Sequence, residues 1–545
     1  MTNSNKINTH QLILAGSSGA LLTVSFPSIG LSWLAWVALV PLMISLRGKS
    51  LKNGFRLGLL TGGVHYLTLM YWLIHTLMTF GHLPFYLSVP ILFLLVAYMA
   101  LYLAVFAAAF AWTTDTQPVC FISAMPAVWV ALEYFRSFFL SGFPWEFLGY
   151  SQYRQLTLIQ AADLTGVYGI SFVILSINVA GFLLWQYFSE RQSSSAMQKR
   201  RSAAAGIAVS FLLVLYMLGY GQWRISSIDA QISKSPSSKI AIVQGNIDQA
   251  IKWDPAFQIS TTEKYLALSK SAKQSSPDLI VWPETAAPFY FLYNAGPTEM
   301  VIKGVRETGT SFLIGSPSFI RQDDHHADFF NSAFLIDPNG NVTGKYDKVH
   351  LVPFGEYVPL QEWFPFIGKI VEEVGDFKSG QKGQTLIWGE FPLGIQICYE
   401  MIFPDLSREM ARNRAAFLIN MTNDAWYGKT SAPYQHFSMA VFRALENRRS
   451  LIRSANTGIS GFIDPIGRII ASTPLFEEAV ITRSLPVLKT ESFYTRYGDV
   501  FALTCMAISI LLFLRYAITN KNIFTKGGPL CLWKSNRRSR NSIKN

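Results

Sequence analysis

The sequence predicts a chain of two parts: a helical membrane bundle of about eight spans, and an α/β domain that lies outside the lipid. Half of the 545 residues are hydrophobic and 15% are charged, whereas an average soluble domain is about 25% charged. No Asp, Glu, Lys or Arg lies between Arg56 and Asp115. A charge-free run of that length can hold two spans of about 20 residues each. From Lys239 onward, short β-rich runs alternate with amphipathic stretches.

Seven apolar segments precede the polar domain and one follows it. They lie at about 11–28, 30–46, 57–78, 86–112, 119–140, 166–188, 205–221 and 498–517. Most are close to the length that a helix needs to cross a bilayer. The expected organisation is therefore a membrane domain of seven helices (1–221), an extramembrane domain (222–496), an eighth helix (497–518) and a basic tail (519–545).

Lys and Arg are concentrated in alternate connections, and this predicts the orientation of the bundle. The connection after the second segment contains Arg47, Lys49, Lys52 and Arg56, and the connection after the sixth contains Arg191, Lys199, Arg200 and Arg201. The C-terminal tail contains Lys521, Lys526, Lys534, Arg537, Arg538, Arg540 and Lys544. The connections after the first and third segments contain none. Because cytoplasmic loops carry the excess of Lys and Arg, both termini are expected in the cytoplasm and residues 222–496 on the outer face. The net charge of +12 is thus attributed to membrane topology, and no nucleic-acid partner is expected.

The extramembrane domain has the pattern of sheets covered by helices. Near-continuous apolar runs predict strands at 240–243, 279–282, 312–314, 333–336, 394–397 and 417–420. Amphipathic stretches predict helices at about 256–275, 298–308, 404–413 and 434–449. Two Asp-Pro-x-Gly sequences, at 337–340 and 464–467, predict turns between strands. The domain is therefore expected to belong to the α/β class.

Three segments place a reactive side chain at the end of a predicted strand. Glu284 lies in Trp-Pro-Glu-Thr, Lys348 in Lys-Tyr-Asp-Lys-Val-His-Leu-Val-Pro-Phe-Gly-Glu, and Cys398 in Ile-Gln-Ile-Cys-Tyr-Glu. Each segment alone has an ordinary interpretation: a helix cap or surface carboxylate, a surface lysine, and a small core residue. Cys398 is the only cysteine of the extramembrane domain, which excludes a disulfide framework there and makes a reactive thiol a candidate.

Taken together and in this order, the three segments resemble the nitrilase superfamily, in which Glu, Lys and Cys each follow a β-strand. The flanking residues resemble more narrowly the apolipoprotein N-acyltransferases, and that resemblance extends over the apolar segments. It implies an αββα sandwich on a membrane bundle. It also implies that Glu284 is a general base, Lys348 the third member of a triad and Cys398 the nucleophile. Trp253, Glu356, Tyr399 and Glu400 match further positions associated with activity in that family.

The resemblance further implies a reaction in two steps. Cys398 would take an acyl chain from a membrane phospholipid, typically phosphatidylethanolamine, and form a thioester. The α-amino group of a diacylglyceryl-cysteine at the N-terminus of an apolipoprotein would then accept that chain. No metal or soluble cofactor is required. The expected location is the bacterial inner membrane, with the catalytic domain facing the periplasm.

Several alternatives stay open from the sequence. Glu133 and Arg136, one helical turn apart near the end of the fifth segment, could form a structural ion pair or part of a headgroup site. The apolar segments 286–293 and 363–368 could contact lipid or could pack on the domain's own core, and lipid contact is favoured. A membrane-tethered nitrilase-like amidase acting on a small substrate is the alternative enzyme. A lipid-handling protein without a reactive thiol is the alternative that is not an enzyme.

Overall fold

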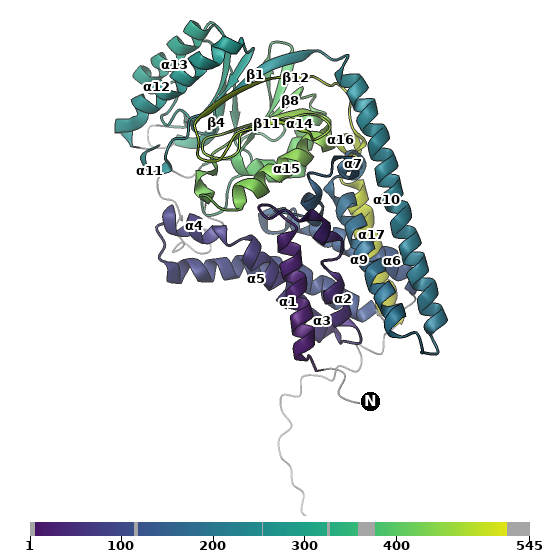
Figure 1. Ribbon diagram of the computed structural model, residues 1–545. Helices are drawn as coiled ribbons and strands as arrows, with labels where there is room; N and C mark the ends of the chain where they lie inside the picture. Colours follow the sequence, from purple (N-terminus) through teal and green to yellow (C-terminus); the bar gives the residue numbers. More distant parts are fainter. Residues whose placement is uncertain (1–5, 114–117, 253, 324–326, 358–376, 520–545) are drawn as a thin grey trace, which may run out of the picture.

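The computed structural model describes the whole chain except residues 1–5, 114–117, 253, 324–326, 358–376 and 520–545, and it has two parts (Figure 1). A helical part is formed by the first 230 or so residues together with the C-terminal helix. An α/β part is formed by the residues between them. The chain therefore leaves the helical part once, builds the α/β part and returns.

The helical part is a bundle with short helices at its upper end. Its elements are α1 (Thr9–Val24), η1 (Ser32–Trp36), α2 (Val40–Leu46), α3 (Leu51–Leu69), α4 (Trp72–Thr79), α5 (Phe85–Thr113), α6 (Pro118–Arg136), η2 (Phe139–Ser141), η3 (Leu148–Gln152), α7 (Leu156–Ile159), α8 (Ala162–Thr165), α9 (Val167–Ser189), α10 (Ala196–Ile232) and α17 (Val500–Thr519). Every predicted apolar segment thus contains helix. Glycines at 54, 58 and 62 let α3 approach α5 closely, since a Cβ at any of them would meet that helix within 3 Å.

The prediction of eight spans is not reproduced by helix length and composition. Among the described residues, three helices are long and apolar enough to cross a membrane: α5, α9 and α10. The pair α3 and α4 makes a fourth if it is counted as one span, although it bends by 53°. Of the other segments, α1 has only 16 residues and the second segment is split between η1 and α2. Hydropathy reports how apolar a segment is, but it does not report where the helix breaks.

Helix α10 connects the two parts as a single rod. Its 37 residues correspond to about 55 Å of helix, well beyond the roughly 30 Å of a hydrocarbon core. It continues past the predicted boundary at 221/222 and ends beside the α/β part, where Asp229 accepts two hydrogen bonds from Arg468 at 2.6 and 2.7 Å. Ile228 packs there against Ile466 and Leu488. The helix therefore fixes the distance between the two parts.

The α/β part contains two six-stranded sheets that face each other. The first has the order β12 (Ala479–Pro486), β1 (Ser237–Gln244), β2 (Leu279–Val281), β3 (Ser311–Arg321), β4 (Ala327–Ile336), β5 (Val342–Asp347). The second has the order β11 (Ile469–Ser472), β10 (Gly461–Ile463), β9 (Ser450–Ala455), β8 (Phe417–Thr422), β7 (Phe391–Ile397), β6 (Thr385–Trp388). Strands β1, β2 and β3 are parallel, as are β7, β8 and β9. All six residues of β8 are buried, as expected for a strand covered on both faces.

Helices cover the outer face of each sheet and complete the αββα sandwich that was predicted. Helices α12 (Pro255–Ala272) and α13 (Ala295–Thr308) lie on the side away from the bundle, and α14 (Pro404–Arg412) and α15 (Ala432–Asn447) on the side toward it (Figure 1). The predicted strands, helices and both Asp-Pro-x-Gly turns are confirmed. The start of α12 shows that the helix is fixed by local sequence signals. The side chain of Asp254 accepts a hydrogen bond from the Ala256 N–H, and Pro255 occupies the first turn.

The sandwich is attached to the bundle through α15, whose side chains are almost all buried. The carboxylate of Glu446 accepts the N–H of Val167 at the start of α9, at 3.0 Å. The Gln435 side chain accepts hydrogen bonds from the indole N–H groups of Trp72 and Trp145, at 3.2 and 2.9 Å. Helix α15 therefore joins the sandwich to the bundle through polar side chains that are hydrogen-bonded to the bundle.

Candidate active site

Three strand ends bring Glu284, Lys348 and Cys398 together. Glu284 follows β2, Lys348 follows β5, and Cys398 follows β7 of the other sheet. Nζ of Lys348 lies 3.8 Å from Oε1 of Glu284. The charges of Glu284 and Lys348 both act on the Cys398 thiol. All three side chains are buried, so the site is a closed cluster in which the three groups interact through a low-dielectric medium.

Cys398 lies at an abrupt turn between β7 and the short helix η5 (Cys398–Ile402). Its φ is +53°, a left-handed conformation that costs a non-glycine residue about 1–2 kcal/mol. Two contacts stabilise the turn: the Ile397 N–H donates to Glu400 at 2.6 Å, and the Asn420 side chain donates to the Cys398 carbonyl oxygen at 3.3 Å. Strain of this kind is typical of functional positions. Here it presents the thiol at the end of the strand.

Both oxygens of Glu284 have a described donor. Oε1 accepts from the Asn331 side chain at 2.8 Å and Oε2 from the Asn423 N–H at 2.9 Å. The following residue, Thr285, has φ +51°. The turn lies directly against Gly315, where an added Cβ would be 2.4 Å from the Pro283 carbonyl oxygen. The carboxylate is therefore held in place by its neighbours.

The electrostatics differ between the lysine and the cysteine. Burial lowers the pKa of Lys348, but the carboxylates of Glu356 and Glu284 outweigh this effect and hold that pKa above its ordinary value. Burial raises the pKa of the Cys398 thiol to about 12, and the charge of Glu284 adds to this increase while Lys348 opposes it. The resting site therefore contains an ammonium and a thiol. A nucleophilic thiolate requires that a base removes the proton as attack occurs.

Glu356 and Glu400 occupy different positions around this cluster. Glu356 accepts from Lys348 at 2.9 Å and from the Val352 N–H at 2.8 Å. Glu400 accepts from the N–H groups of Val349 and His350, at 2.6 and 3.0 Å, and so ties the end of β5 to the cysteine turn. Burial raises the pKa of Glu400 to about 7. Glu356 thus holds the lysine directly, whereas the hydrogen bonds of Glu400 hold the backbone.

The other predicted site residues have mixed outcomes. Tyr399 is buried and packs against Phe143 of the bundle, with ring centroids 6.3 Å apart. Trp253 and the segment 363–368 lie outside the described residues. The prediction of lipid contact for Phe289 is wrong, since Phe289 is 3% exposed and belongs to a core cluster. In the segment 286–293, Leu292 and Tyr293 are exposed.

Three residues near the catalytic cluster were not anticipated from the sequence. Asn331 bridges Glu284 and Glu356, at 2.8 and 3.1 Å from their oxygens. Asn423 donates to Glu284 through its backbone. Lys252 donates to the Glu284 carbonyl oxygen at 3.1 Å. Their sequence context carries no signal of catalysis, because each acts only where two sheets or loops meet. Within the described part of the chain, no group of three His, Cys, Asp or Glu side chains could hold a metal ion.

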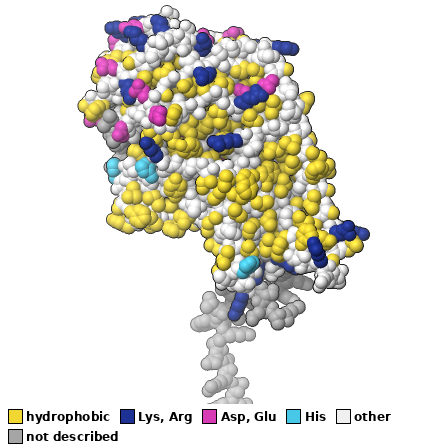
Figure 2. All heavy atoms as spheres, viewed as in Figure 1, with side chains coloured by type: hydrophobic (Ala, Val, Ile, Leu, Met, Phe, Trp, Pro, Cys, Tyr) yellow, Lys and Arg dark blue, Asp and Glu magenta, His cyan; other side chains and the backbone are white. Residues whose placement is uncertain are grey.

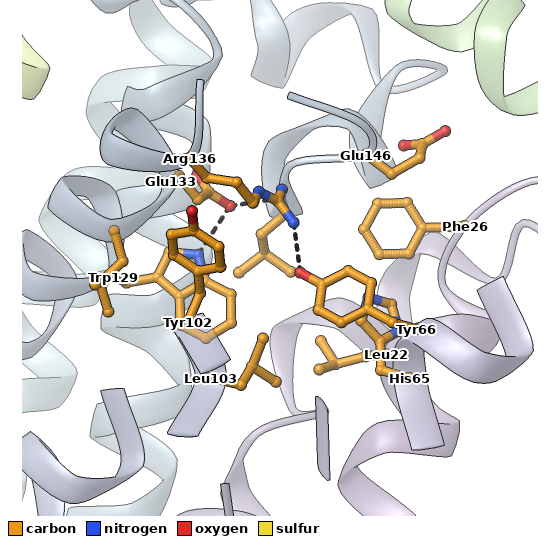
Figure 3. A pocket seen from close by; sticks show the side chains of 12 residues that line it. Leu22, Phe26, His65, Tyr66, Tyr102, Leu103, Trp129, Glu133, Arg136 and Glu146 are labelled. Atoms are coloured by element: carbon orange, nitrogen blue, oxygen red, sulfur yellow. Dashed lines mark hydrogen bonds between the residues drawn. The ribbon is translucent and has the colours of Figure 1, made fainter. Parts of the chain in front are cut away.

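Glu133 and Arg136 line a small pocket in the bundle (Figure 3). Glu133 accepts from the Trp129 indole at 2.9 Å and from the Leu148 N–H at 2.8 Å. Arg136 donates to the Tyr66 hydroxyl at 2.6 Å. The free space is about 20 Å³, close to what one water molecule needs. A pocket of this size favours a structural role for the two charged residues over a headgroup site.

Comparison with known proteins adds independent evidence. The family model described as the apolipoprotein N-acyltransferase N-terminal domain matches residues 18–180, and the carbon-nitrogen hydrolase model matches residues 239–493. An apolipoprotein N-acyltransferase of Geobacter metallireducens is 44% identical over 95% of this chain and 98% of its own. That of Allorhizobium ampelinum is 34% identical over 86% and 88%. An amidase structure from Nesterenkonia sp. is 19% identical, covers 46% of this chain and 90% of that chain, and has a TM-score of 0.35.

The two family models match the two parts of the fold in their order along the chain, and the relatives match it over most of its length. The chain belongs to the apolipoprotein N-acyltransferase family.

Proposed function

We propose that this protein transfers an acyl chain from a membrane phospholipid to the α-amino group of the diacylglyceryl-cysteine at the N-terminus of apolipoproteins. The acyl chain is carried as a thioester on Cys398. The observation that carries the proposal is the convergence of Glu284, Lys348 and Cys398 from three strand ends in a domain attached to an apolar bundle. Relatives in the family are named for N-acyl transfer, and this geometry provides the base, the cation and the thiol that acyl transfer through a thioester needs.

The first half-reaction forms the thioester. Glu284 takes the thiol proton as the Cys398 sulfur attacks the carbonyl carbon of the lipid ester. The Lys348 ammonium and a backbone N–H stabilise the negative charge on the carbonyl oxygen. The C–O bond then breaks, and the leaving glycerol oxygen receives the proton from Glu284. The products are acyl-Cys398 and a lysophospholipid.

The second half-reaction uses the same groups in the opposite direction. The α-amino nitrogen of the apolipoprotein attacks the thioester carbonyl, and Glu284 takes a proton from that nitrogen. The C–S bond breaks, the proton returns to sulfur, and an amide is released. Because both halves pass through an oxyanion at the same place, Lys348 has the same role in each. Hydrogen bonds with Glu356 and Asn331 hold Lys348 and Glu284 in fixed positions relative to each other.

Both substrates reside in the membrane, and residues beside the catalytic cluster contact the helical bundle directly. Tyr399, next to the nucleophile, packs on Phe143, and Trp72 packs on Tyr427 with ring centroids 4.9 Å apart. Hydrophobic side chains cover most of the lower half of the molecule, while charged side chains gather on the upper half and at the lower end (Figure 2). This distribution supports a bundle immersed in lipid with the catalytic domain above it.

We further propose that the bundle crosses the inner membrane more than once and that residues 222–496 face the periplasm. The length of helix α10 supports this proposal. Arg201 lies near its start and the exposed Trp223 lies 22 residues later, about 33 Å along the helix axis. A basic residue at one interface and an aromatic residue at the other match the thickness of a hydrocarbon core. A periplasm-active reporter fused after Ser235 should be active and one fused after Arg201 should not. The reverse pattern would contradict the orientation.

The reaction is tested by mass spectrometry of the purified protein after incubation with phospholipid vesicles. One acyl chain should be found on Cys398, and a lysophospholipid should be released in equal amount. Cys505→Ser is the matched control, since Cys505 is a buried free thiol of α17 far along the chain from the site. Vesicles of phosphatidylethanolamine are compared with vesicles of phosphatidylglycerol carrying the same acyl chains, and the first should acylate faster. Hydrolysis of small amides without any acyl-Cys398 from lipid would favour the amidase alternative.

A further inference from the structure

A second lysine reaches the site from the short helix α11 (Gln249–Lys252). Nζ of Lys252 donates to the Glu284 carbonyl oxygen at 3.1 Å, and the side chain is 2% exposed. The Gln249 side chain accepts a hydrogen bond from Asn423 at 2.5 Å, and Asn423 in turn donates to Oε2 of Glu284. One short helix therefore secures both the backbone and the carboxylate of Glu284.

The position of Lys252 also matters for charge. Lys348 is already engaged by Glu356 at 2.9 Å and Glu284 at 3.8 Å. The hydrogen bond described for the Lys252 ammonium, in contrast, goes to a neutral carbonyl oxygen. The Lys252 ammonium interacts electrostatically with Glu284 and with the sulfur of Cys398. Before proton transfer the negative charges beside Lys348 are on Glu284 and Glu356, and after it they are on Glu356 and the Cys398 sulfur. Lys348 supplies one positive charge, and the Lys252 ammonium supplies a second.

We propose that Lys252 is a positioning residue for acyl transfer: it fixes the turn that carries Glu284, and its positive charge favours the Cys398 thiolate. The proposal rests on the proposed function only in taking Cys398 as the nucleophile and Glu284 as its base. It assigns two effects to one side chain, and the rate of Cys398 alkylation measures the effect of the charge. The hydrogen bond governs how well Glu284 is placed, whereas the charge governs how easily the thiol ionises.

The groups that act on the thiol come from several elements, and the test must leave them unchanged. They are Glu284, Lys348, Asp424 and the Thr422 hydroxyl, together with Lys252 and Tyr427. The imidazole of His436 is hydrogen-bonded to the backbone of Cys398. Asp424 is paired with Arg453 at 2.8 Å, and this pairing limits its repulsion of the thiolate. Burial lowers the pKa of Lys252 to about 8, although Glu284 and the thiolate oppose this effect. Its charge is therefore present below pH 8 and is lost above.

The experiment measures the rate at which iodoacetamide alkylates Cys398 in the full-length protein in detergent, followed by peptide mass spectrometry from pH 6 to pH 10. Lys252→Met should slow alkylation about tenfold at pH 6 to 7, because an opposite charge near a titrating group typically shifts its pKa by about one unit or more. The difference from wild type should close as the pH rises through about 8. Lys252→Gln, which keeps a donor without the charge, should show the same pH-dependent loss. Lys252→Arg should restore most of the rate.

Two controls separate this proposal from simpler explanations. Lys264→Met removes a lysine of α12 that pairs with Glu478 at the surface and should leave alkylation unchanged. The thermal unfolding midpoint of each variant identifies any loss of folding. Equal alkylation of wild type and Lys252→Met at pH 6 to 7 would overturn the proposal, as would a loss of the same size at every pH. Acyl-enzyme formation from phospholipid by the wild type is measured in parallel. Its absence would instead reject the proposed function, because alkylation does not depend on the substrate.

Discussion

The catalytic cluster and the junction below it both bury charged side chains, but they use different chemical groups. At the junction, Asp163 of α8 accepts hydrogen bonds from Arg448 and Arg224, at 2.7 and 2.6 Å. A guanidinium does not lose its proton in proteins, so these charges are permanent. The catalytic cluster instead combines Lys348 and Glu284 with a thiol, and these groups can exchange protons. The fold thus places fixed charges where the two parts are joined and titratable charges where a proton must move.

Replacing the nucleophile should produce the largest effect. Cys398→Ser should remain folded and inserted but form no acyl-enzyme from phospholipid, because Ser in place of Cys is a far weaker nucleophile at neutral pH. The measurement is intact-protein mass after incubation with lipid, with Cys505→Ser as the control that should acylate normally. Acyl transfer by purified Cys398→Ser would show that the nucleophile is elsewhere.

Replacing the base should slow the first half-reaction without removing the thiol. Glu284→Gln keeps the size of the side chain and one of its two accepting oxygens but cannot take a proton, so acyl-enzyme formation should fall about 10²–10⁴-fold. The time course of acylation is compared with that of Glu446→Gln, which changes a buried carboxylate of α15 outside the cluster. Acylation of Glu284→Gln at the wild-type rate would transfer the role of base to Glu356 or Glu400.

The junction should respond in stability and much less in chemistry. Asp163→Asn leaves Arg448 buried without a carboxylate partner, and breaking such a pair typically costs about 3 kcal/mol. The thermal unfolding midpoint should therefore fall clearly. The control is Asp405→Asn, which removes the partner of Lys382 in an ion pair of similar length but with both side chains about half exposed. It should cost about 0.5 kcal/mol or less. Equal destabilisation by the two variants would contradict a supporting role for the junction.

The two regions also differ in how far the sequence predicts them. Glu284, Lys348 and Cys398 could be placed at strand ends because apolar strand runs and the residues that follow them are local features. The contributions of Asn331 and Lys252 could not be predicted, since they depend on how separate strands and loops meet. In the bundle, every predicted apolar segment contains helix, but apolar composition located neither the short helices η3, α7 and α8 nor the 53° bend between α3 and α4. Hydropathy likewise could not distinguish the buried Phe289 from the exposed Tyr293, because both are apolar residues of one loop.

The smallest effect is expected from a change of pH. Its measurement tests whether Cys398 holds its proton as strongly as its burial indicates. Burial raises the pKa of Cys398 to about 12, so the thiolate is a minor species at neutral pH and its fraction increases as protons are removed. Alkylation of Cys398 should therefore still rise about tenfold between pH 9 and pH 10, where an ordinary thiol with a pKa near 8.5 has nearly levelled off. Free cysteine in the same reaction provides that reference curve. A plateau for Cys398 by pH 9 would mean that the two lysines outweigh burial and that the enzyme rests with a thiolate. Proton removal by Glu284 would then not be part of the first half-reaction.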